Sequence, residues 1–229
     1  MTAITALTAQ STVGVSAVES VSPAMVIAQV RAVAADIGID AVKVGMLGTA
    51  ATIEAVRLAL GELEAGTPVV VDPVMVAESG AALLDRSARS VLIERLLPLA
   101  TVATPNLPEA RALSGLSDAD ADTLARAVHA LGPAAVVVTG GHRELATDVF
   151  FDGETITALP GERFPDGASH GSGCTHSSAL AAFLARGLTP LDAARKAKEI
   201  AAAAVRDGLA GIGAGAGPVD ALGLLLRAR

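Results

Sequence analysis

Short apolar runs alternate with longer amphipathic stretches along this chain. The runs at 41–44, 68–71, 102–104 and 134–139 are rich in valine and show little polar alternation, which is typical of strands buried on both faces. The stretch 23–36 follows Ser22, a residue type that caps helices, and has apolar side chains near helical spacing; 49–63 repeats this pattern. The order strand, helix, strand predicts a parallel sheet with helices on both faces.

The second half of the chain adds a hairpin and two helices. Residues 149–151 and 155–159 flank an Asp-Gly sequence that favours a tight antiparallel turn. A Gly-rich loop at 169–175 leads into helical patterns at 176–186 and 190–207, and no repeat or low-complexity linker divides the chain. We therefore expect a single α/β domain over residues 1–229: three layers (α/β/α), a mostly parallel central sheet and an antiparallel edge hairpin.

Composition and charge narrow the classes of partner. The chain has 229 residues, a net charge of −7 and 2% aromatic residues, so it lacks the basic surface and stacking rings of nucleic-acid binders, and we expect no nucleic-acid partner. No apolar run approaches the roughly 18 residues of a membrane-spanning helix, so we expect no membrane partner. The single cysteine, Cys174, excludes an internal disulfide, and residues 1–20 lack the pattern of a secretory leader. These features predict a cytoplasmic protein.

The loop at 171–174 is the first candidate for chemistry. It opens into a predicted helix, so successive backbone N–H groups converge where an anion or a transferring phosphoryl group can bind. The alternative is a tight connection without a ligand. Cys174 likewise has two interpretations, a thiolate stabilised by the helix start or a small core residue. His170 and His176 flank the loop without the spacing of zinc ligands.

Polar residues also follow two of the predicted strands, at the sheet edge where parallel sheets bind ligands. Asp72 follows 68–71, and Asn106 and Glu109 follow 102–104. Asn106 and Glu109 can organise Mg²⁺ with its waters and phosphates, or they can form a capping box at a helix start. The phosphate-loop pattern G-x-x-x-x-G-K-[ST] is absent, and the glycines at 211–217 miss G-x-G-x-x-G. Neither a P-loop NTPase nor a Rossmann dehydrogenase fits.

Six ordered motifs cover nearly the whole chain: TAITALTAQ at 2–10, VGMLG at 44–48, VDPVM at 71–75, TPNLPEA at 104–110, VTGGH at 138–142 and HGSGCT at 170–175. Together they resemble the hydroxymethylpyrimidine/phosphomethylpyrimidine kinases of thiamine biosynthesis, in the ribokinase-like superfamily. Cys174 is the informative position, because most sugar and pyridoxal kinases of that superfamily carry aspartate there. The resemblance implies a ribokinase-like fold and a phosphotransferase that uses ATP and Mg²⁺.

The implied substrate is 4-amino-5-hydroxymethyl-2-methylpyrimidine, phosphorylated first on its hydroxymethyl group and then to the diphosphate. By resemblance, Cys174 activates or orients the substrate hydroxyl, and an anion site for the transferring phosphoryl group is formed by the amides of Gly171, Ser172, Gly173 and Cys174. Gln10 corresponds to the side chain that recognises the pyrimidine edge, with Met46 and Val74 packed on the ring.

The resemblance also implies a nucleotide site. Its predicted ATP and Mg²⁺ residues are Asn106, Glu109, Thr139 and Gly141, with Glu109 organising the metal. Lys198 has a weaker match, as a contact to a phosphate.

The chain departs from the family pattern at its start, where the family's first strand, Gly-rich loop and helix have no counterpart. We therefore expect a chain that is truncated by about one β-loop-α unit relative to the family, with a sheet edge that lacks its usual neighbour. Thr139 stands where lysine is frequent, and Ala216 where histidine is frequent. Two other functions stay open: a pyrimidine-binding protein without catalysis, and a pyridoxal or pyridoxine kinase. A homodimer is compatible with such a fold.

Overall fold

The computed structural model describes residues 1–77, 80, 82–85, 87–140, 146–165 and 167–223. Its central sheet has the strand order β3-β4-β5-β6-β7-β8, and β1 pairs with β2 in a separate sheet. The strands are β1 (Ala6–Ser11), β2 (Gly14–Ser20), β3 (Val42–Val44), β4 (Val69–Val71), β5 (Val102–Ala103), β6 (Val136–Val138), β7 (Asp148–Phe151) and β8 (Ile156–Leu159). The helices are α1 (Pro23–Asp36), α2 (Ala50–Leu60), α3 (Ala88–Val91), α4 (Leu107–Ser114), α5 (Ala121–His129), α6 (Ser172–Ala185) and α7 (Pro190–Arg206). A π-helical turn (Leu92–Leu96) and a 3₁₀ turn (Leu97–Leu99) extend α3.

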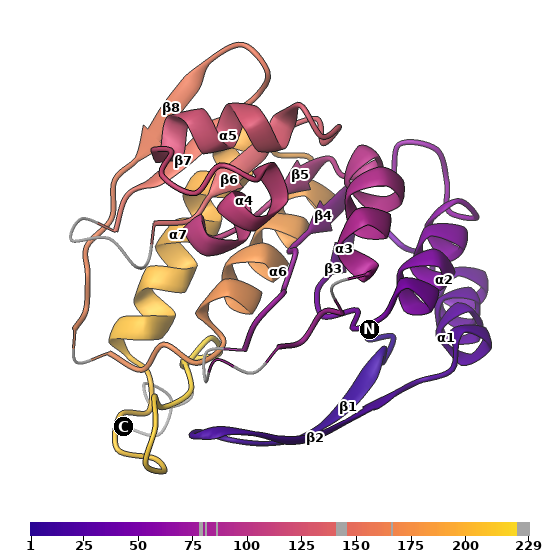
Figure 1. Cartoon of the computed structure of the whole chain (residues 1–229), viewed down its shortest axis with the longest axis horizontal. Helices are drawn as coiled ribbons and strands as arrows, with labels where there is room; N and C mark the ends of the chain where they lie inside the picture. Colours follow the sequence, from indigo (N-terminus) through magenta and orange to yellow (C-terminus); the bar gives the residue numbers. More distant parts are fainter. Residues whose placement is uncertain (78–79, 81, 86, 141–145, 166, 224–229) are drawn as a thin grey trace.

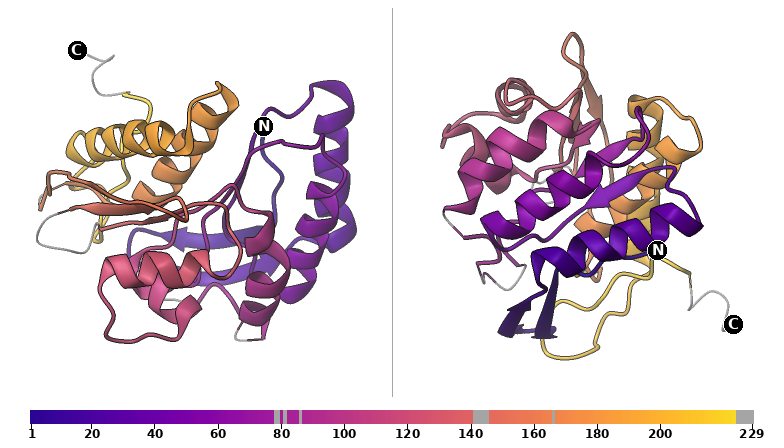
Figure 2. Two further views of the ribbon diagram at one scale, coloured as in Figure 1. Left: turned by 90° about the horizontal axis from the view of Figure 1, so that it is seen from above. Right: turned by 90° about the vertical axis from the view of Figure 1, so that its right-hand side faces the viewer.

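Helices cover both faces of the central sheet (Figure 1, Figure 2). Helices α6 and α7 lie together on one face, while α2, α3, α4 and α5 lie on the other, with α1 beside α2. Strands β3 to β6 are parallel, and β6, β7 and β8 pair antiparallel. The prediction of three layers around a mostly parallel sheet with an antiparallel edge hairpin is confirmed.

The valine-rich strands fill the core on both sides of the sheet. Val70 and Val137 pack with α6 and α7, whereas their neighbours Val71 and Val138 pack with the helices on the opposite face. All four are at most 1% exposed. A strand buried on both faces has no polar side to present, which explains the continuous apolar runs in the sequence.

Local signals set the helix bounds. The Ser22 hydroxyl accepts the backbone N–H of Met25 at 3.3 Å and Pro23 lies in the first turn, so α1 has the predicted bounds. Helix α2 ends at Leu60, short of the predicted 63, because Gly61 caps it. Helix α6 begins at Ser172 rather than at the predicted 176, so Cys174 lies inside its first turn.

The hairpin β1–β2 is not predicted by the hydrophobic pattern, and neither are helices α3 and α5. The hairpin runs along the lower edge of the molecule in Figure 1, and its side chains are mostly exposed. Thr5 holds its base by donating from Oγ1 to the carbonyl of Met46 at 2.7 Å. Its turn meets the C-terminal glycines, where the N–H of Gly215 donates to Oγ1 of Thr12 at 3.3 Å. In the described part of the chain, no helix has the length and apolarity to cross a bilayer.

Candidate active site

The carboxyl ends of the four parallel strands gather most of the predicted site residues at one edge of the sheet. Met46 follows β3 and Val74 follows β4; both are half-buried. Asn106 follows β5, and Thr139 follows β6 and bridges to Asn106. The backbone N–H of Thr139 donates to the carbonyl of Pro105 at 2.9 Å, which joins the two segments directly. The predicted residue Gly141 lies outside the described residues.

A buried carboxylate ties helix α6 to this edge. Asp72, directly after β4, is 6% exposed, and its Oδ2 lies 3.2 Å from the Lys43 ammonium of β3. The hydroxyl of Ser177, in the second turn of α6, donates to the same oxygen at 3.0 Å. The start of α6 is therefore held over the carboxyl ends of the strands. The sequence placed Asp72 at this edge of the sheet but gave no indication of Ser177 as its partner. A lone lysine in a valine-rich strand was the one signal for Lys43.

The first turn of α6 has the backbone of an anion site. Gly171 precedes it with a φ of 91°, a left-handed conformation that glycine adopts without strain. The N–H of Ser172 donates to the carbonyl of Ser169 at 3.0 Å, so this member of the predicted amide set already has an internal partner. Space is open around Gly173, where an added Cβ would meet nothing within 4 Å. A phosphoryl group can therefore approach this turn closely.

Cys174 is exposed, so its interpretation as a small core residue is wrong. It lines a hollow of about 430 Å³ with Thr175, Ser178, Ala179, Ile200 and Ala221. This volume lies in the range of small-molecule sites. The thiol is therefore accessible to a ligand at the start of α6.

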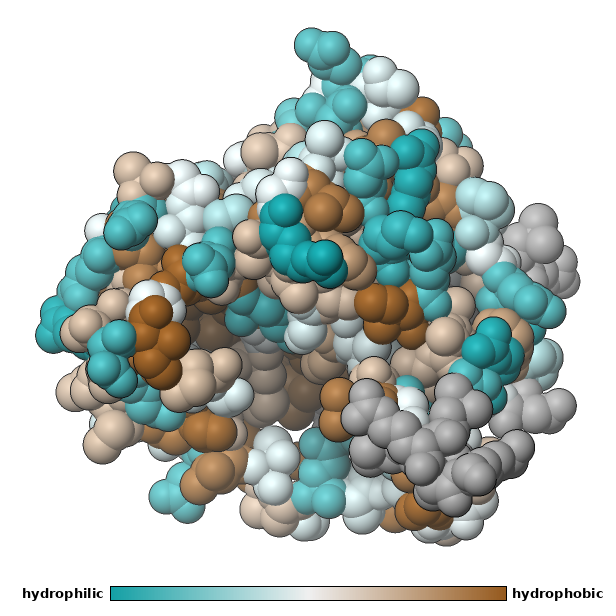
Figure 3. Space-filling view, turned by 180° about the vertical axis from the view of Figure 1, so that it is seen from behind, coloured by the Kyte–Doolittle hydropathy of each residue, from teal (hydrophilic) through white to brown (hydrophobic). Residues whose placement is uncertain are grey.

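Gln10 is exposed on the hairpin and lines a second hollow, of about 510 Å³, formed by the hairpin's own residues 9–11 and 13–16. Figure 3 shows the surface hollowed between the body of the molecule and its lower edge, where the hairpin runs. The structure thus places Gln10 and Cys174 on separate hollows. The base of the hairpin contacts the carboxyl edge of the sheet through the bond from Thr5 to the carbonyl of Met46.

Asn106 and Glu109 form the capping box that the sequence allowed. Oδ1 of Asn106 accepts the N–H of Glu109 at 2.9 Å, and Oε2 of Glu109 accepts the N–H of Asn106 at 2.9 Å. Glu109 is 8% exposed. Burial raises its pKa to about 7, the bond from Asn106 opposes this, and the charge of Asp72 raises it further. The capping role is confirmed, and the electrostatics leave a carboxyl group close to ionisation at neutral pH.

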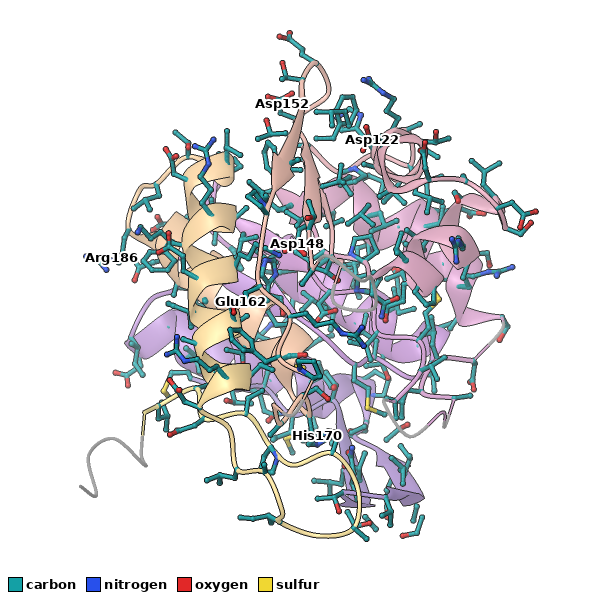
Figure 4. The ribbon with its side chains drawn as sticks, turned by 90° about the vertical axis from the view of Figure 1, so that its left-hand side faces the viewer. Asp122, Asp148, Asp152, Glu162, His170 and Arg186 are labelled. Atoms are coloured by element: carbon teal, nitrogen blue, oxygen red, sulfur yellow. The ribbon has the colours of Figure 1, made fainter. Side chains whose placement is uncertain are left out.

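Thr139 and Lys198, both predicted to contact the nucleotide, lie in different surroundings. Thr139 lies at the carboxyl edge of the sheet, directly after β6. The Lys198 ammonium, predicted to contact a phosphate, lies 2.8 Å from Oδ1 of Asp148 and donates to the carbonyl of Ala146 at 2.6 Å. Figure 4 shows Asp148 in the interior, at the opposite end of β7 from Asp152 on the hairpin turn. Asp148 is a further residue that sequence reasoning missed.

The two histidines beside the loop do not form a metal site. His176 is buried, and burial lowers its pKa, partly offset by the charge of Asp148. Among the residues that the structure describes, no three His, Cys, Asp or Glu side chains are close enough together to hold a metal ion.

Known proteins are similar to this chain in both sequence and fold. The phosphomethylpyrimidine kinase family model matches residues 1–220. The hydroxymethylpyrimidine/phosphomethylpyrimidine kinase of Rhizobium meliloti (strain 1021) is 47% identical over 224 residues, covering 94% of this chain and 83% of that protein. Bacillus subtilis pyridoxal kinase in its ADP complex is 36% identical with a TM-score of 0.87, covering 99% of this chain and 87% of that chain. Phosphomethylpyrimidine kinase from Clostridium difficile 630 is 35% identical with a TM-score of 0.74, covering 87% and 83%.

The fold and the site geometry define an α/β kinase of the ribokinase-like class. Within that class, the chain belongs to the phosphomethylpyrimidine kinase family.

We expect Glu109→Gln to gain stability relative to the parent as the pH rises from 5 to 8. The unfolded chain releases this proton near the ordinary value of 4.5, whereas the folded chain holds it up to a pKa of about 7. Raising the pH through this window therefore favours the unfolded parent. Glutamine has no proton to lose, and its Oε1 still accepts the Asn106 N–H.

The measurement is the difference in thermal midpoint between variant and parent at each pH. Glu64→Gln, at an exposed carboxylate, serves as the control. Parallel curves of thermal midpoint against pH for the parent and Glu109→Gln would contradict the raised pKa of Glu109.

Proposed function

We propose that this chain transfers the γ-phosphoryl group of ATP to the hydroxymethyl group of 4-amino-5-hydroxymethyl-2-methylpyrimidine, and then phosphorylates the monophosphate to the diphosphate. The single observation that carries the proposal is the accessible Cys174 in the first turn of α6, held over the carboxyl edge of the sheet by Asp72. Family membership and the printed activity of the relatives support it.

The residues of this turn match the needs of phosphoryl transfer, which depends on position and charge stabilisation. The substrate oxygen attacks the γ-phosphorus, the bond to the β–γ bridging oxygen breaks, and ADP leaves with that electron pair. The amides of Gly173 and Cys174 face the charge of the transferring group. Sγ of Cys174 is the base that takes the proton of the hydroxymethyl group.

The Mg²⁺ that we propose with ATP fits the residues at the start of α4. Mg²⁺ is commonly held by one or two carboxylates together with substrate phosphates, so a cluster of three ligands is not required. The Thr104 hydroxyl is buried and has no hydrogen-bond partner among the described residues, and Thr104 precedes Glu109 by five positions in the chain. Asn106 and Glu109 would hold the ion and its waters. The ion supplies charge neutralisation for the phosphates when bound.

For the pyrimidine, we propose the half-buried side chains of Met46 and Val74 as the apolar floor under the ring. Gln10 offers both a donor and an acceptor to the aminopyrimidine edge. Because Gln10 lies on a hollow of its own, this role requires the hairpin to bring it over the ring. The bond from Thr5 to the Met46 carbonyl links the hairpin to that floor.

We also propose where the protein is located in the cell, how its domain is organised and which oligomer it forms. A single cysteine and the need for ATP fit the cytoplasm. We propose one kinase domain across residues 1–229 and a homodimer, supported by large apolar side chains exposed on the hairpin, among them Leu7, Val13 and Val18.

A pyridoxal kinase is the second candidate, favoured by the TM-score of 0.87 to the Bacillus subtilis enzyme. A pyrimidine-binding protein without catalysis is the third, favoured by the separation of Gln10 from Cys174.

ADP release distinguishes the three candidates. With ATP, Mg²⁺ and hydroxymethylpyrimidine or its phosphate, we expect ADP to form at a rate that pyridoxal does not support. Because the chain has neither Trp nor Tyr, its concentration must come from amino-acid analysis rather than absorbance at 280 nm. ADP with pyridoxal alone supports the second candidate. Calorimetric binding of the pyrimidine without ADP supports the third.

Replacing Cys174 by alanine tests the proposed base. We expect kcat to fall by about 10²-fold or more, because a positioned base contributes about that much, while the Kd for the pyrimidine changes by less than about twofold. Cys174→Ser keeps a small polar group that is far less acidic than a thiol. Its kcat should lie between that of the parent and that of Cys174→Ala. Steady-state kinetics with an unfolding curve for each variant provides the measurement. A Cys174→Ala variant with parental kcat would remove the thiol from the reaction.

A further inference from the structure

The buried carboxylate of Asp148 joins the end of β6 to helix α7 and lies beside His176 of helix α6. Its Oδ1 accepts the backbone N–H of Gly140, just after β6, at 2.8 Å. The same oxygen lies 2.8 Å from Nζ of Lys198 on α7. Nε2 of His176 on α6 lies 4.0 Å from Oδ2. One side chain at the start of β7 therefore fixes the end of β6 relative to the α6–α7 layer.

The charges in this cluster balance within the protein itself. The side chains of Asp148 and Lys198 are 6% and 13% exposed, so each charge needs a close partner. Burial lowers the pKa of His176, which stays neutral near pH 7. Lys198 is consequently the cation that pairs with Asp148 among the described residues. Removing either member alone would leave a buried charge without its counterion.

Two backbone segments pack against each other beside the Asp148–Lys198 pair. Lys198 donates to the carbonyl of Ala146 at 2.6 Å, two residues before Asp148. A Cβ added to Gly140 would overlap the carbonyl of Thr147, so the two segments 139–140 and 146–148 lie against each other. The ammonium group of Lys198 thus contacts one of these segments directly and reaches the other through the Asp148 carboxylate.

We propose that Lys198 and Asp148 are positioning residues for the nucleotide, and that Lys198 acts through Asp148 rather than by contacting a phosphate. The pair holds Thr139 and Gly140 at the carboxyl edge of the sheet, where they bind ATP. This inference rests on the proposed function, which assigns the nucleotide to that segment. It revises the role that the sequence predicted for Lys198.

Lys198→Met is the first test, with Lys196→Met as the matched control. Lys196 is on the same helix but is exposed and paired with exposed Glu199. We expect Lys198→Met to raise the KM for ATP about tenfold or more, with the KM for the pyrimidine within about twofold of the parent. Lys198→Arg, which keeps the charge, should recover part of the affinity. Lys196→Met should match the parent in every constant.

A double-mutant cycle separates positioning from direct contact. If Lys198 acts through Asp148, adding Lys198→Met to Asp148→Asn raises the KM for ATP little beyond the value for Asp148→Asn. If Lys198 contacts a phosphate, Lys198→Met weakens ATP binding equally in both backgrounds. The double variant has no unpaired buried charge, so it keeps the test available should Lys198→Met fail to fold.

The double-mutant cycle is repeated with the Kd of ADP, measured by calorimetry, as the readout. This measurement needs no acceptor substrate. A chain that binds ADP but does not phosphorylate the pyrimidine contradicts the proposed function and leaves this inference testable. Parental ADP and ATP affinity in folded Lys198→Met, or full additivity in the cycle, overturns the inference.

Discussion

The carboxylate of Asp72, enclosed at the end of β4, needs a cation and hydrogen bonds to remain charged inside the protein. Lys43 of β3 and Ser177 of α6 supply them, at 3.2 and 3.0 Å. Since the partners come from a strand and a helix that are far apart in sequence, this interaction ties the second turn of α6 to the carboxyl end of β4. The first turn of α6 contains Cys174 and its neighbouring amides, so the geometry of the proposed phosphoryl site depends on this one interaction.

Asp148 repeats the arrangement on the other half of the sheet, with Lys198 of α7 as its cation. The helix layer of α6 and α7 is packed on the strands by apolar contacts, which have no preferred direction. Two buried ion pairs add direction at the edge where chemistry takes place. Among the residues that the structure describes, no ion pair joins the hairpin β1–β2 to α6, and Gln10 and Cys174 line separate hollows.

The sequence predicted the parts of the fold in which one strong local signal acts. Ser22 and Pro23 located the start of α1, and continuous valine runs located the buried strands. The hydrophobic pattern did not predict the hairpin β1–β2. Its strands are mostly exposed, so its apolar and polar residues follow no burial pattern. The start of α6 was placed too late because glycines usually end helices, whereas Gly171 in its left-handed conformation begins this one.

The site was predicted unevenly for a related reason. Motifs identify residue types at fixed spacing, and they directed attention to Cys174, Asn106, Glu109 and Thr139. They carry no information on long-range partners, so Lys198 was assigned to a phosphate although Asp148, fifty positions away in the chain, holds its charge. For Asn106 and Glu109 the partners are local, so the sequence could predict them. The capping box and the proposed metal role involve the same side-chain oxygens.

The proposed function requires the first turn of α6 to receive the transferring phosphoryl group. A crystal structure with ADP, Mg²⁺ and hydroxymethylpyrimidine tests this requirement. We predict that the terminal phosphate of ADP is directed toward the amides of Gly173 and Cys174, and that the substrate hydroxyl lies within hydrogen-bond distance of the Cys174 thiol. A terminal phosphate directed elsewhere, or a pyrimidine bound away from that thiol, would contradict it.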